Sequence, residues 1–324
     1  MFISRTPFRV SFVGGGTDLP CFYTKEQGAV LSMTVNKYVY ITVNRRFDDT
    51  LRISYSQTEI VDEIDQIKHP LFRETLRHTG IHSGLEVTSI ADVPGGTGMG
   101  SSSSFAVALL HALEAFKGEH KTAYELAEDA CHLEINVLGE PIGKQDQYAA
   151  AFGGLRRYQF NPDGTVFVDP VICSPDTKRI LFQHLLFFYL GGVRDARRVL
   201  EQQVRNTSCK FDLLRKNRAL VDEFWKILVC GRGIEELGSL LHEAWTYKKQ
   251  FADNVSNGRI DDLYDRARAA GASGGKVLGA GMSGFLMMFC DPRKKSAVRE
   301  ALRELREVEF GFEPEGSKII YVGS

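Results

Sequence analysis

The stretch VPGGTGMGSSSSFAVALL, residues 93–110, sets four glycines and four serines directly before a hydrophobic segment. Glycines permit positive φ angles and let a ligand approach the backbone closely. The free N–H groups and partial positive charge at a helix N-terminus favour phosphate and other anions. A simple N-cap needs one serine, so four in a row favour an anion site over a flexible connector.

The rest of the chain alternates between strand-like and helix-like segments. Runs of β-branched and aromatic residues bounded by turns predict strands at 8–13, 29–47, 51–56, 85–94, 185–192, on both sides of a glycine turn within 275–291, and at 317–322. Hydrophobic periodicity predicts helices at 103–118, 122–139, 195–207, 211–230, 233–253, 259–270 and 292–305. Gly118 is expected to end the helix after the serines, and Thr122 and Glu125 have the spacing of a capping box. We expect 51–56 to form a hairpin with the strand before it.

Both halves of the chain mix strands with helices, so the expected fold class is α+β. The pattern shifts near 175–185, which predicts two domains, residues 1–178 and 179–324. A chain of 324 residues is long enough for two domains that share a cleft.

The composition excludes several classes of function. The chain is 43% hydrophobic and 25% charged, which is typical of globular proteins. Lys and Arg number 40 against 41 Asp and Glu, so the charge gives no reason to expect a nucleic-acid or membrane partner. No apolar run approaches the roughly 20 residues that span a bilayer, and the six cysteines contain no CxxC pair. We expect a cytoplasmic protein with buried, reduced thiols and small-molecule partners.

Two common nucleotide motifs do not fit. The only GK pairs, at Gly143 and Gly275, are followed by Gln and Val, so neither completes a P-loop. A GxGxxG pattern at Gly279, Gly281 and Gly284 opens into the strand-like segment FLMMF, whereas a dinucleotide site requires a helix there.

Two further segments carry polar residues in apolar surroundings. RTPFRVSFVGGGTDLP, residues 5–20, places Arg9, Thr17 and Asp18 around a strand and its glycine turn. A guanidinium and a carboxylate there could hold a polyol or a phosphate, although a surface salt bridge beside a turn is an alternative. The second segment, residues 132–154, offers Glu134 on a helix and Asp146 after a turn, flanked by Gln, Tyr and small residues.

In this order, the clusters resemble the motifs of the GHMP kinases, small-molecule kinases named after galactose, homoserine, mevalonate and phosphomevalonate. The family's second motif resembles P-x-x-x-G-L-G-S-S, and residues 94–102 read PGGTGMGSS, with Met99 in place of Leu. Its first motif combines a basic and an acidic residue, matched by Arg9 and Asp18, although GGTD replaces the usual G-E-H-x-D. Its third motif is a glycine-rich strand–turn–strand, matched by KVLGAGMSGFL, residues 276–286.

The resemblance implies a ribosomal-protein-S5-like N-terminal α/β domain and a ferredoxin-like C-terminal domain, with ATP in the cleft between them. The ATP phosphates would lie on the second motif, which comprises Pro94, Gly95, Gly96, Thr97, Gly98, Met99, Gly100, Ser101, Ser102 and Ser103. Ser101 and Glu134 match the Mg²⁺ ligands.

The resemblance also assigns the reacting residues. Asp146 matches the catalytic acid/base, with Arg9 or Lys144 holding its charge state. The residues that match acceptor contacts are Arg9, Gly16, Thr17 and Asp18. The residues that would line the cleft from the second domain are Gly279, Gly281 and Gly284.

Within the family, residues 5–20, 28–40 and 143–155 look most similar to the sugar 1-kinases of D-glycero-D-manno-heptose 7-phosphate, with the fucokinase domains as near relatives. The implied reaction is ATP-dependent phosphorylation of the anomeric (C1) hydroxyl to the 1,7-bisphosphate, for nucleotide-activated heptose in capsule or lipopolysaccharide biosynthesis. The candidate cations for the substrate's own phosphate are Arg9, Lys37, Arg194 and Arg197. An L-fucose-type or other sugar 1-kinase, a non-catalytic sugar sensor, an ATP-dependent decarboxylase and a homodimer stay open.

Overall fold

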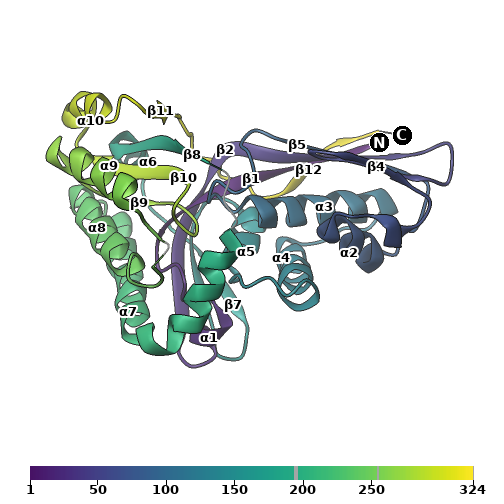
Figure 1. Ribbon diagram of the computed structural model, residues 1–324, viewed down its shortest axis with the longest axis horizontal. Coiled ribbons are helices and arrows are strands. Elements are labelled where there is room, and N and C mark those ends of the chain that lie inside the picture. The colour runs from purple at the N-terminus through teal and green to yellow at the C-terminus, as the bar shows by residue number, and fades with distance from the viewer. Residues whose placement is uncertain (193–195, 254, 324) are drawn as a thin grey trace.

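The computed structural model describes residues 1–192, 196–253 and 255–323. The described strands form an eight-stranded sheet and a four-stranded sheet. Figure 1 shows the larger sheet running towards the end of the molecule where both chain termini lie, with the smaller sheet at the opposite end. Helices and strands are mixed in both parts, which confirms the expected α+β class.

The elements have the following bounds. The strands are β1 (Phe2–Val13), β2 (Gly28–Arg45), β3 (Leu51–Ser54), β4 (Thr58–Val61), β5 (Leu85–Ala91), β6 (Leu155–Phe160), β7 (Val166–Pro170), β8 (Leu185–Gly191), β9 (Ala272–Val277), β10 (Gly284–Cys290), β11 (Arg306–Glu307) and β12 (Lys318–Val322). The helices are α1 (Pro20–Tyr23), α2 (Pro70–Thr79), α3 (Ser101–Lys117), α4 (Ala123–Cys131), α5 (Gln145–Phe152), α6 (Pro175–His184), α7 (Ala196–Cys230), α8 (Leu237–Lys248), α9 (Gly258–Ala269) and α10 (Lys295–Ala301), with a π-helical turn η2 (His132–Val137) after α4 and short 3₁₀ turns η1 (Ile64–Gln66), η3 (Ile234–Glu236) and η4 (Pro292–Lys294).

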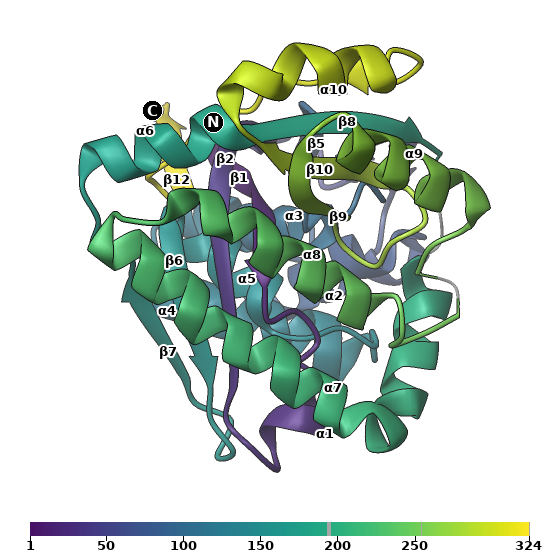
Figure 2. The same cartoon turned by 90° about the vertical axis from the view of Figure 1, so that its left-hand side faces the viewer.

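The eight-stranded sheet is built around β1 and β2, which pair antiparallel over most of their length. Its order is β12-β1-β2-β5-β3-β4, and β6 and β7 extend it beside the first half of β2. In Figure 2, α7 and α8 lie in front of β1 and β2, while α3 and α5 lie behind them. The two central strands are therefore covered on both faces, which explains their nearly continuous buried stretches.

The expected hairpin between 29–47 and 51–56 is wrong. The edge of β2 that it would need is taken by β5, which pairs with residues 39–45. β5 buries Leu85 and Val87 in the core and β3 buries Leu51 and Ile53 there as well, so the apolar pattern of the two strands does not distinguish the inner position from the outer one. β3 lies outside β5, parallel to it, and forms its hairpin with β4 instead.

The four-stranded sheet has the order β11-β8-β10-β9. Its strands β9 and β10 confirm the expected strand–turn–strand. One hydrophobic cluster runs from Phe12 on β1 through Val221 and Phe224 on α7 to Phe285 and Met287 on β10. The two sheets thus share a core, which fixes the turns at their junction.

Local signals located the end of α3 and the start of α4. Gly118 ends α3 in a left-handed conformation, and Thr122 and Glu125 form the predicted capping box of α4. The two helices expected at 195–207 and 211–230 are one continuous helix, α7, because neither Pro nor Gly interrupts the chain between them.

The other long-range features concern the chain ends, the thiols and the helices. β12 returns to the large sheet and pairs with β1. Burial expected for the cysteines is found at Cys131 and Cys290, whereas Cys230 is exposed. Among the helices in the described ranges, none has the length and low charge needed to cross a membrane.

Candidate active site

The glycine loop, residues 94–100, joins β5 to α3. Gly96, Gly98 and Gly100 adopt φ angles of +74°, +77° and +73°. Gly100 is the N-cap of α3 and offers no side-chain hydrogen bond, so the first N–H groups of the helix lack an intrahelical acceptor. The Gly96 N–H donates to the Ser101 hydroxyl at 3.3 Å, which ties the loop to the helix. This geometry suits an anion at the start of α3.

Glu134 lies on η2 and contacts the start of α3. Its carboxylate accepts hydrogen bonds from the Ser102 hydroxyl at 2.6 Å and from the Gln147 side-chain amide at 2.7 Å. Burial raises the pKa of Glu134 to about 7, and the charge of Asp146 acts in the same direction. π-Helical turns are frequent at functional sites, and this one places a carboxyl group that changes its charge near neutral pH.

Arg9 on β1 holds Asp146 at the start of α5. Its Nε donates to Oδ1 at 2.6 Å and its Nη2 donates to Oδ2 at 2.7 Å. The remaining nitrogen, Nη1, donates to the Gly98 carbonyl at 2.7 Å, and the Arg9 N–H donates to the Met99 carbonyl at 3.1 Å. Such a bidentate pair fixes the orientation of a carboxylate as well as its charge. Arg9 is buried, while 22% of the Asp146 side chain stays exposed beside the glycine loop.

Thr17 lies inside the N-terminal turn, residues 14–18. The side chain is fully buried, and its hydroxyl donates to the Gly14 carbonyl at 2.8 Å and the Ala29 carbonyl at 2.9 Å. The same oxygen accepts the Ala29 N–H at 3.0 Å. These contacts use the hydroxyl to hold the turn against β2, so it is not presented to the outside.

Asp18 is also turned inward. Its carboxylate accepts the Gly16 N–H at 2.9 Å and the Gln145 N–H at 3.4 Å, which links the N-terminal turn to the first turn of α5. Burial, together with the charge of Asp146, raises the pKa of Asp18. Gly16 and Asp18 were expected to contact the acceptor, and in the structure their hydrogen bond to each other lies within the N-terminal turn.

The C-terminal turn, residues 278–283, packs against the glycine loop. A Cβ on Gly279 would stand 2.3 Å from the Gly98 Cα, and a Cβ on Gly98 would stand 2.5 Å from the Leu278 carbonyl oxygen. Gly284 faces the glycine loop equally closely, whereas Gly281 faces the segment before α9. Gly279 and Gly284 thus let the backbone around the C-terminal turn contact the backbone of the glycine loop directly. Both residues were expected to line the cleft, and in the structure they form this contact.

Two lysines of the second half of the chain reach the same junction. The Lys276 ammonium donates to the Phe12 carbonyl at 2.9 Å, and burial, followed by the charge of Arg9, lowers the pKa of Lys276 to about 7. The Lys248 ammonium donates to the Gly279 carbonyl. Burial, followed by the charge of Lys276, lowers the pKa of Lys248 as well.

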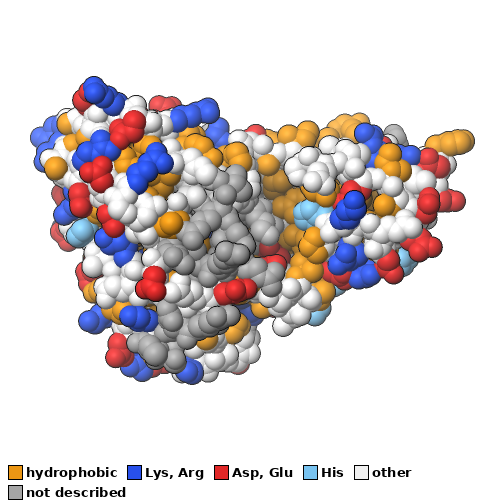
Figure 3. Space-filling model, viewed as in Figure 1, with side chains coloured by type: hydrophobic (Ala, Val, Ile, Leu, Met, Phe, Trp, Pro, Cys, Tyr) orange, Lys and Arg blue, Asp and Glu red, His pale blue; other side chains and the backbone are white. Residues whose placement is uncertain are grey.

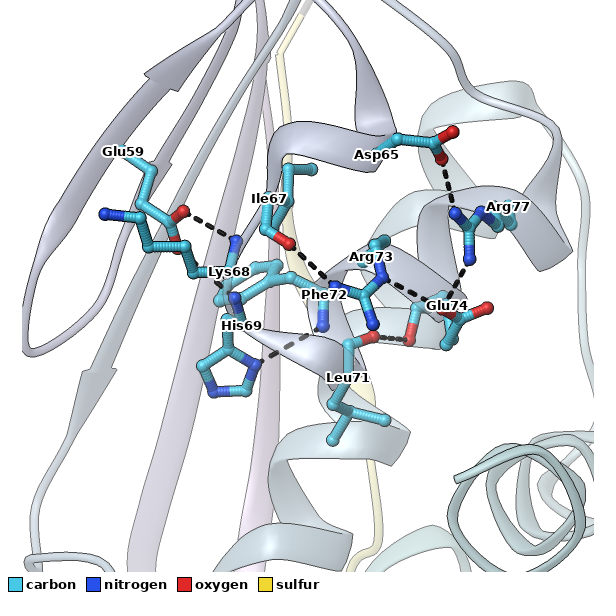
Figure 4. Close-up of polar contacts among 11 residues, drawn as sticks. Glu59, Asp65, Ile67, Lys68, His69, Leu71, Phe72, Arg73, Glu74 and Arg77 are labelled. Carbon is cyan, nitrogen blue, oxygen red and sulfur yellow. Dashed lines mark hydrogen bonds and ion pairs between the residues drawn. The ribbon is translucent and has the colours of Figure 1, made fainter. Parts of the chain in front are cut away.

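The rings of His69 and Phe72 pack against that of Phe105 near the start of α3, and Figure 4 shows the polar contacts around the start of α2. The His69 ring accepts the Phe72 N–H at 3.4 Å and caps α2, and Glu59 accepts two backbone N–H groups of the segment before this helix. The His69 ring lies 4.8 Å from the Tyr55 ring and 5.6 Å from that of Phe105 on α3. Burial lowers the pKa of His69, so its uncharged form is favoured. Figure 3 shows hydrophobic side chains on the side of the α2–α3 part that faces the middle of the molecule.

The structure therefore brings Arg9, Asp146, Glu134 and the glycine loop together. The Glu134 carboxylate accepts a hydrogen bond from Ser102, whereas Ser101, which the resemblance implies as a magnesium ligand, accepts the Gly96 N–H.

Other expected cations lie elsewhere. Lys144 donates to the Gly164 carbonyl at 2.8 Å, in the turn between β6 and β7, and has no direct bond to Asp146 among the contacts described. Lys37 lies half-buried on β2, where its pairing with β1 is irregular. Arg194 and the Arg197 side chain fall outside the described residues.

The sequence reasoning did not single out Lys276 or Asn217. A lysine inside a buried, glycine-rich strand was a usable signal for Lys276, since an ammonium group is rarely placed there without a partner. Asn217 gave no such signal, because its place on a long helix does not reveal what it faces. Its side-chain amide donates to the Gly15 carbonyl at 2.9 Å.

Two family models match this chain. Residues 67–154 match the GHMP kinases N terminal domain, and residues 225–307 match the GHMP kinases C terminal model. The matched segments contain the glycine loop, Glu134, Asp146 and the C-terminal turn.

Individual proteins are similar over the whole chain. A D-glycero-alpha-D-manno-heptose 7-phosphate kinase from Campylobacter jejuni is 29% identical, with 97% of each chain covered. The bifunctional fucokinase/GDP-fucose pyrophosphorylase of Arabidopsis thaliana is 28% identical over 94% of this chain, which spans 31% of that protein. The crystal structure of a D-glycero-D-manno-heptose 1-phosphate kinase from Bacteroides thetaiotaomicron superimposes with a TM-score of 0.83 at 24% identity and covers both chains completely.

Proposed function

The chain belongs to the GHMP kinases and is an ATP-dependent sugar kinase, and from this premise we propose that it phosphorylates the anomeric hydroxyl of D-glycero-D-manno-heptose 7-phosphate. The product is the 1,7-bisphosphate, for nucleotide-activated heptose and surface polysaccharide synthesis. The observation that carries the proposed chemistry is the Arg9–Asp146 pair beside the glycine loop. The choice of acceptor is supported by the Campylobacter relative.

Asp146 accepts the proton of the acceptor hydroxyl during phosphoryl transfer. Arg9 binds both carboxylate oxygens and the Gly98 carbonyl, so the base and the glycine loop keep a fixed relation. Phosphoryl transfer depends mainly on such positioning and on charge stabilisation. The ATP phosphates lie at the N-terminus of α3, and the aromatic rings of His69 and Phe105 offer apolar surface for the adenine beside it.

The residues present also fit a magnesium ion. Mg²⁺ is usually held by one or two carboxylates together with substrate phosphates and water. Glu134 and the Ser102 hydroxyl supply one carboxylate and one neutral oxygen at the phosphate end of the site. No cluster of three or more His, Cys, Asp or Glu side chains suited to a metal occurs within the described ranges, which agrees with a site completed by the nucleotide. When bound, the ion would neutralise charge on the phosphates.

Magnesium binding is expected to weaken below neutral pH. Because the pKa of Glu134 lies at about 7, the carboxylate is mostly charged at pH 8 and mostly protonated at pH 6. The magnesium concentration for half-maximal rate should rise about tenfold between these values. Glu134→Gln should need more magnesium at both pH values and lose most of this dependence.

Protonation of the nucleotide affects the unaltered protein and Glu134→Gln equally. The difference between their magnesium titrations therefore reports on Glu134 alone. Identical pH dependence in the two proteins would exclude Glu134 as a ligand.

The acceptor's own phosphate needs cations near the sugar. Lys276 and Lys248 lie near Arg9, and neither forms an ion pair with a carboxylate in the described part of the chain; burial and the neighbouring cations lower the pKa of both, and a bound phosphate would favour their charged forms. We assign them to this phosphate in place of Lys37. Charge-assisted contacts are typically worth about 1.5–3 kcal/mol each, so two of them would favour a phosphorylated sugar about 10²–10⁴-fold.

A panel of acceptors tests this assignment. Heptose 7-phosphate should give rapid ADP formation, mannose 6-phosphate and free heptose should react weakly, and L-fucose should be almost inert. The measurement is kcat/KM for each sugar under the same ATP and magnesium concentrations. If L-fucose were the best acceptor, the heptose proposal would fail and the sugar-kinase activity would remain.

We also propose residues 1–178 and 179–324 as the two functional domains. The boundary falls within α6 (Pro175–His184), which leads directly into β8 of the small sheet. The last strand, β12, crosses back to complete the large sheet, so the second domain also supports the first.

A further inference from the structure

Two polar side chains near Asp146 have atoms without a hydrogen-bond partner. In the part of the chain that the structure describes, Ser11 Oγ and Gln145 Oε1 are both buried and unpartnered. Ser11 is 6% exposed. Buried polar groups are nearly always hydrogen-bonded, and an exception calls for an explanation such as a missing ligand.

These two side chains flank the reacting pair. Ser11 follows Arg9 by two residues on β1, so both side chains point to the same face of the sheet. Gln145 directly precedes Asp146 in the first turn of α5. The unpartnered atoms therefore lie next to the groups that would handle the acceptor hydroxyl.

The space between them is open because residue 15 is a glycine. The position of a Cβ on Gly15 lies 3.8 Å from the Gln145 side-chain nitrogen and 4.0 Å from Ser11 Oγ, and these are the only heavy atoms outside its chain neighbours that come within 4 Å. An atom placed there would be in van der Waals contact with both polar groups without a clash.

The walls of this space are held rigidly. Asn217 of α7, itself 4% exposed, donates to the Gly15 carbonyl at 2.9 Å. Thr17 and Asp18 anchor the rest of the N-terminal turn from inside. A turn that is held in this way does not have to be ordered when a ligand binds, so binding does not carry that entropy cost.

We propose that this space receives a hydroxyl group of the sugar acceptor, and that Ser11 and Gln145 select the acceptor through hydrogen bonds to that hydroxyl. The inference rests on the proposed sugar-kinase site. It adds two specificity-determining residues and a requirement on the acceptor: a hydroxyl on the carbon next to the one that is phosphorylated.

The hydrogen-bonding capacity of the two side chains fits one hydroxyl. A serine hydroxyl can donate or accept, and the glutamine amide offers both an acceptor oxygen and donor N–H groups. One sugar hydroxyl can therefore accept from the Gln145 side-chain nitrogen that faces this space and donate to Ser11 Oγ. Sites that hydrogen-bond a substrate hydroxyl strongly reject analogues that lack it, because their own polar groups are then left unpaired.

The first test fills the space. Gly15→Ala should leave the melting temperature unchanged, because its backbone is outside the positive-φ region and the added methyl group meets no close atom. It should raise KM for the acceptor by about tenfold or more and leave KM for ATP unchanged. Gly258→Ala is the matched control, since this glycine also has free space around it but lies at the start of α9. Unchanged acceptor KM in Gly15→Ala would overturn the proposal.

The second test removes the hydrogen bonds singly. Ser11→Ala and Gln145→Met should each lower kcat/KM about tenfold for the best acceptor of the panel. Neither should change kcat/KM more than about twofold for the analogue that is deoxygenated at the neighbouring carbon. Ser32→Ala is the control, because Ser32 is also buried and unpartnered and lies directly across from Ser11, yet it is not within 4 Å of the space over Gly15.

These experiments distinguish a failure of the proposed sugar-kinase activity from a failure of the role of Ser11 and Gln145. If no sugar in the panel is phosphorylated, the proposed function fails. If a sugar is phosphorylated but Ser11→Ala and Gln145→Met lower its rate and that of the deoxy analogue equally, the role of Ser11 and Gln145 fails and the kinase activity stands.

Discussion

Asp146→Asn is expected to fold and to lose turnover by about 10²–10⁴-fold, the usual contribution of general acid–base catalysis. Asparagine keeps the size of the side chain and one oxygen for Arg9, but it cannot take the proton of the acceptor hydroxyl. The affinity for ATP should change little, because the hydrogen bonds described for the Asp146 carboxylate come from Arg9 and not from the N–H groups at the start of α3. Single-turnover rates and ATP titrations by calorimetry measure the two effects separately.

The same substitution should also lower stability. Arg9 is 4% exposed, and a buried cation that loses its partner typically costs about 3–5 kcal/mol. The assays therefore belong below the melting temperature of the variant. Asp176→Asn provides the control, because Asp176 pairs with Arg179 on an exposed helix and its loss should affect neither rate nor stability measurably. A kcat near that of the unaltered protein would remove Asp146 from the mechanism.

Gly98→Val is expected to abolish measurable ATP binding and to lower the melting temperature by several degrees. Valine is strained at the φ angle of +77° that this residue adopts, at a cost of about 1–2 kcal/mol. Its Cβ would also stand 2.5 Å from the Leu278 carbonyl oxygen, so the contact between the glycine loop and the C-terminal turn must open. The sequence alone predicts the loss of ATP binding; the contact adds the loss of stability.

Gly80→Val separates these causes. Gly80 has a similar φ angle of +70° but no neighbouring atom within 4 Å of its Cβ position. This control should show the backbone strain alone, with normal ATP binding. If Gly98→Val melted no earlier than Gly80→Val and bound ATP normally, the glycine loop would have no part in holding the nucleotide or the turn. Scanning calorimetry and ATP titration of both variants decide the matter.

Features encoded locally could be predicted from the sequence. The capping box at Thr122 and the end of α3 at Gly118 depend on a few neighbouring residues, and both were predicted correctly. The strand–turn–strand around Gly281 followed from glycines set between apolar runs. In the candidate site, the pairing of Arg9 with Asp146 agrees with the motif that suggested them.

Features that depend on distant partners could not be predicted in this way. The strand β3 was assigned to the wrong neighbour because its own residues do not record that β5 occupies the edge of β2. Ser102 and Ser101 are chemically equivalent in the sequence, and only the rotation of α3 relative to η2 distinguishes them. The inward orientation of Thr17 and Asp18 is likewise decided by β2 and α5, which lie elsewhere in the chain.

The pairing of β1 with β12 has a consequence for synthesis of the chain. Residues 2–5 leave the ribosome before their partners at 318–322, which follow roughly 300 residues later, a delay of roughly 15–60 s at usual translation rates. During that time the outer edge of β1 exposes unsatisfied backbone groups, which can pair with strands of other chains. The nascent protein therefore depends on chaperones or on low local concentration for this interval, and the arrival of β12 ends its exposure.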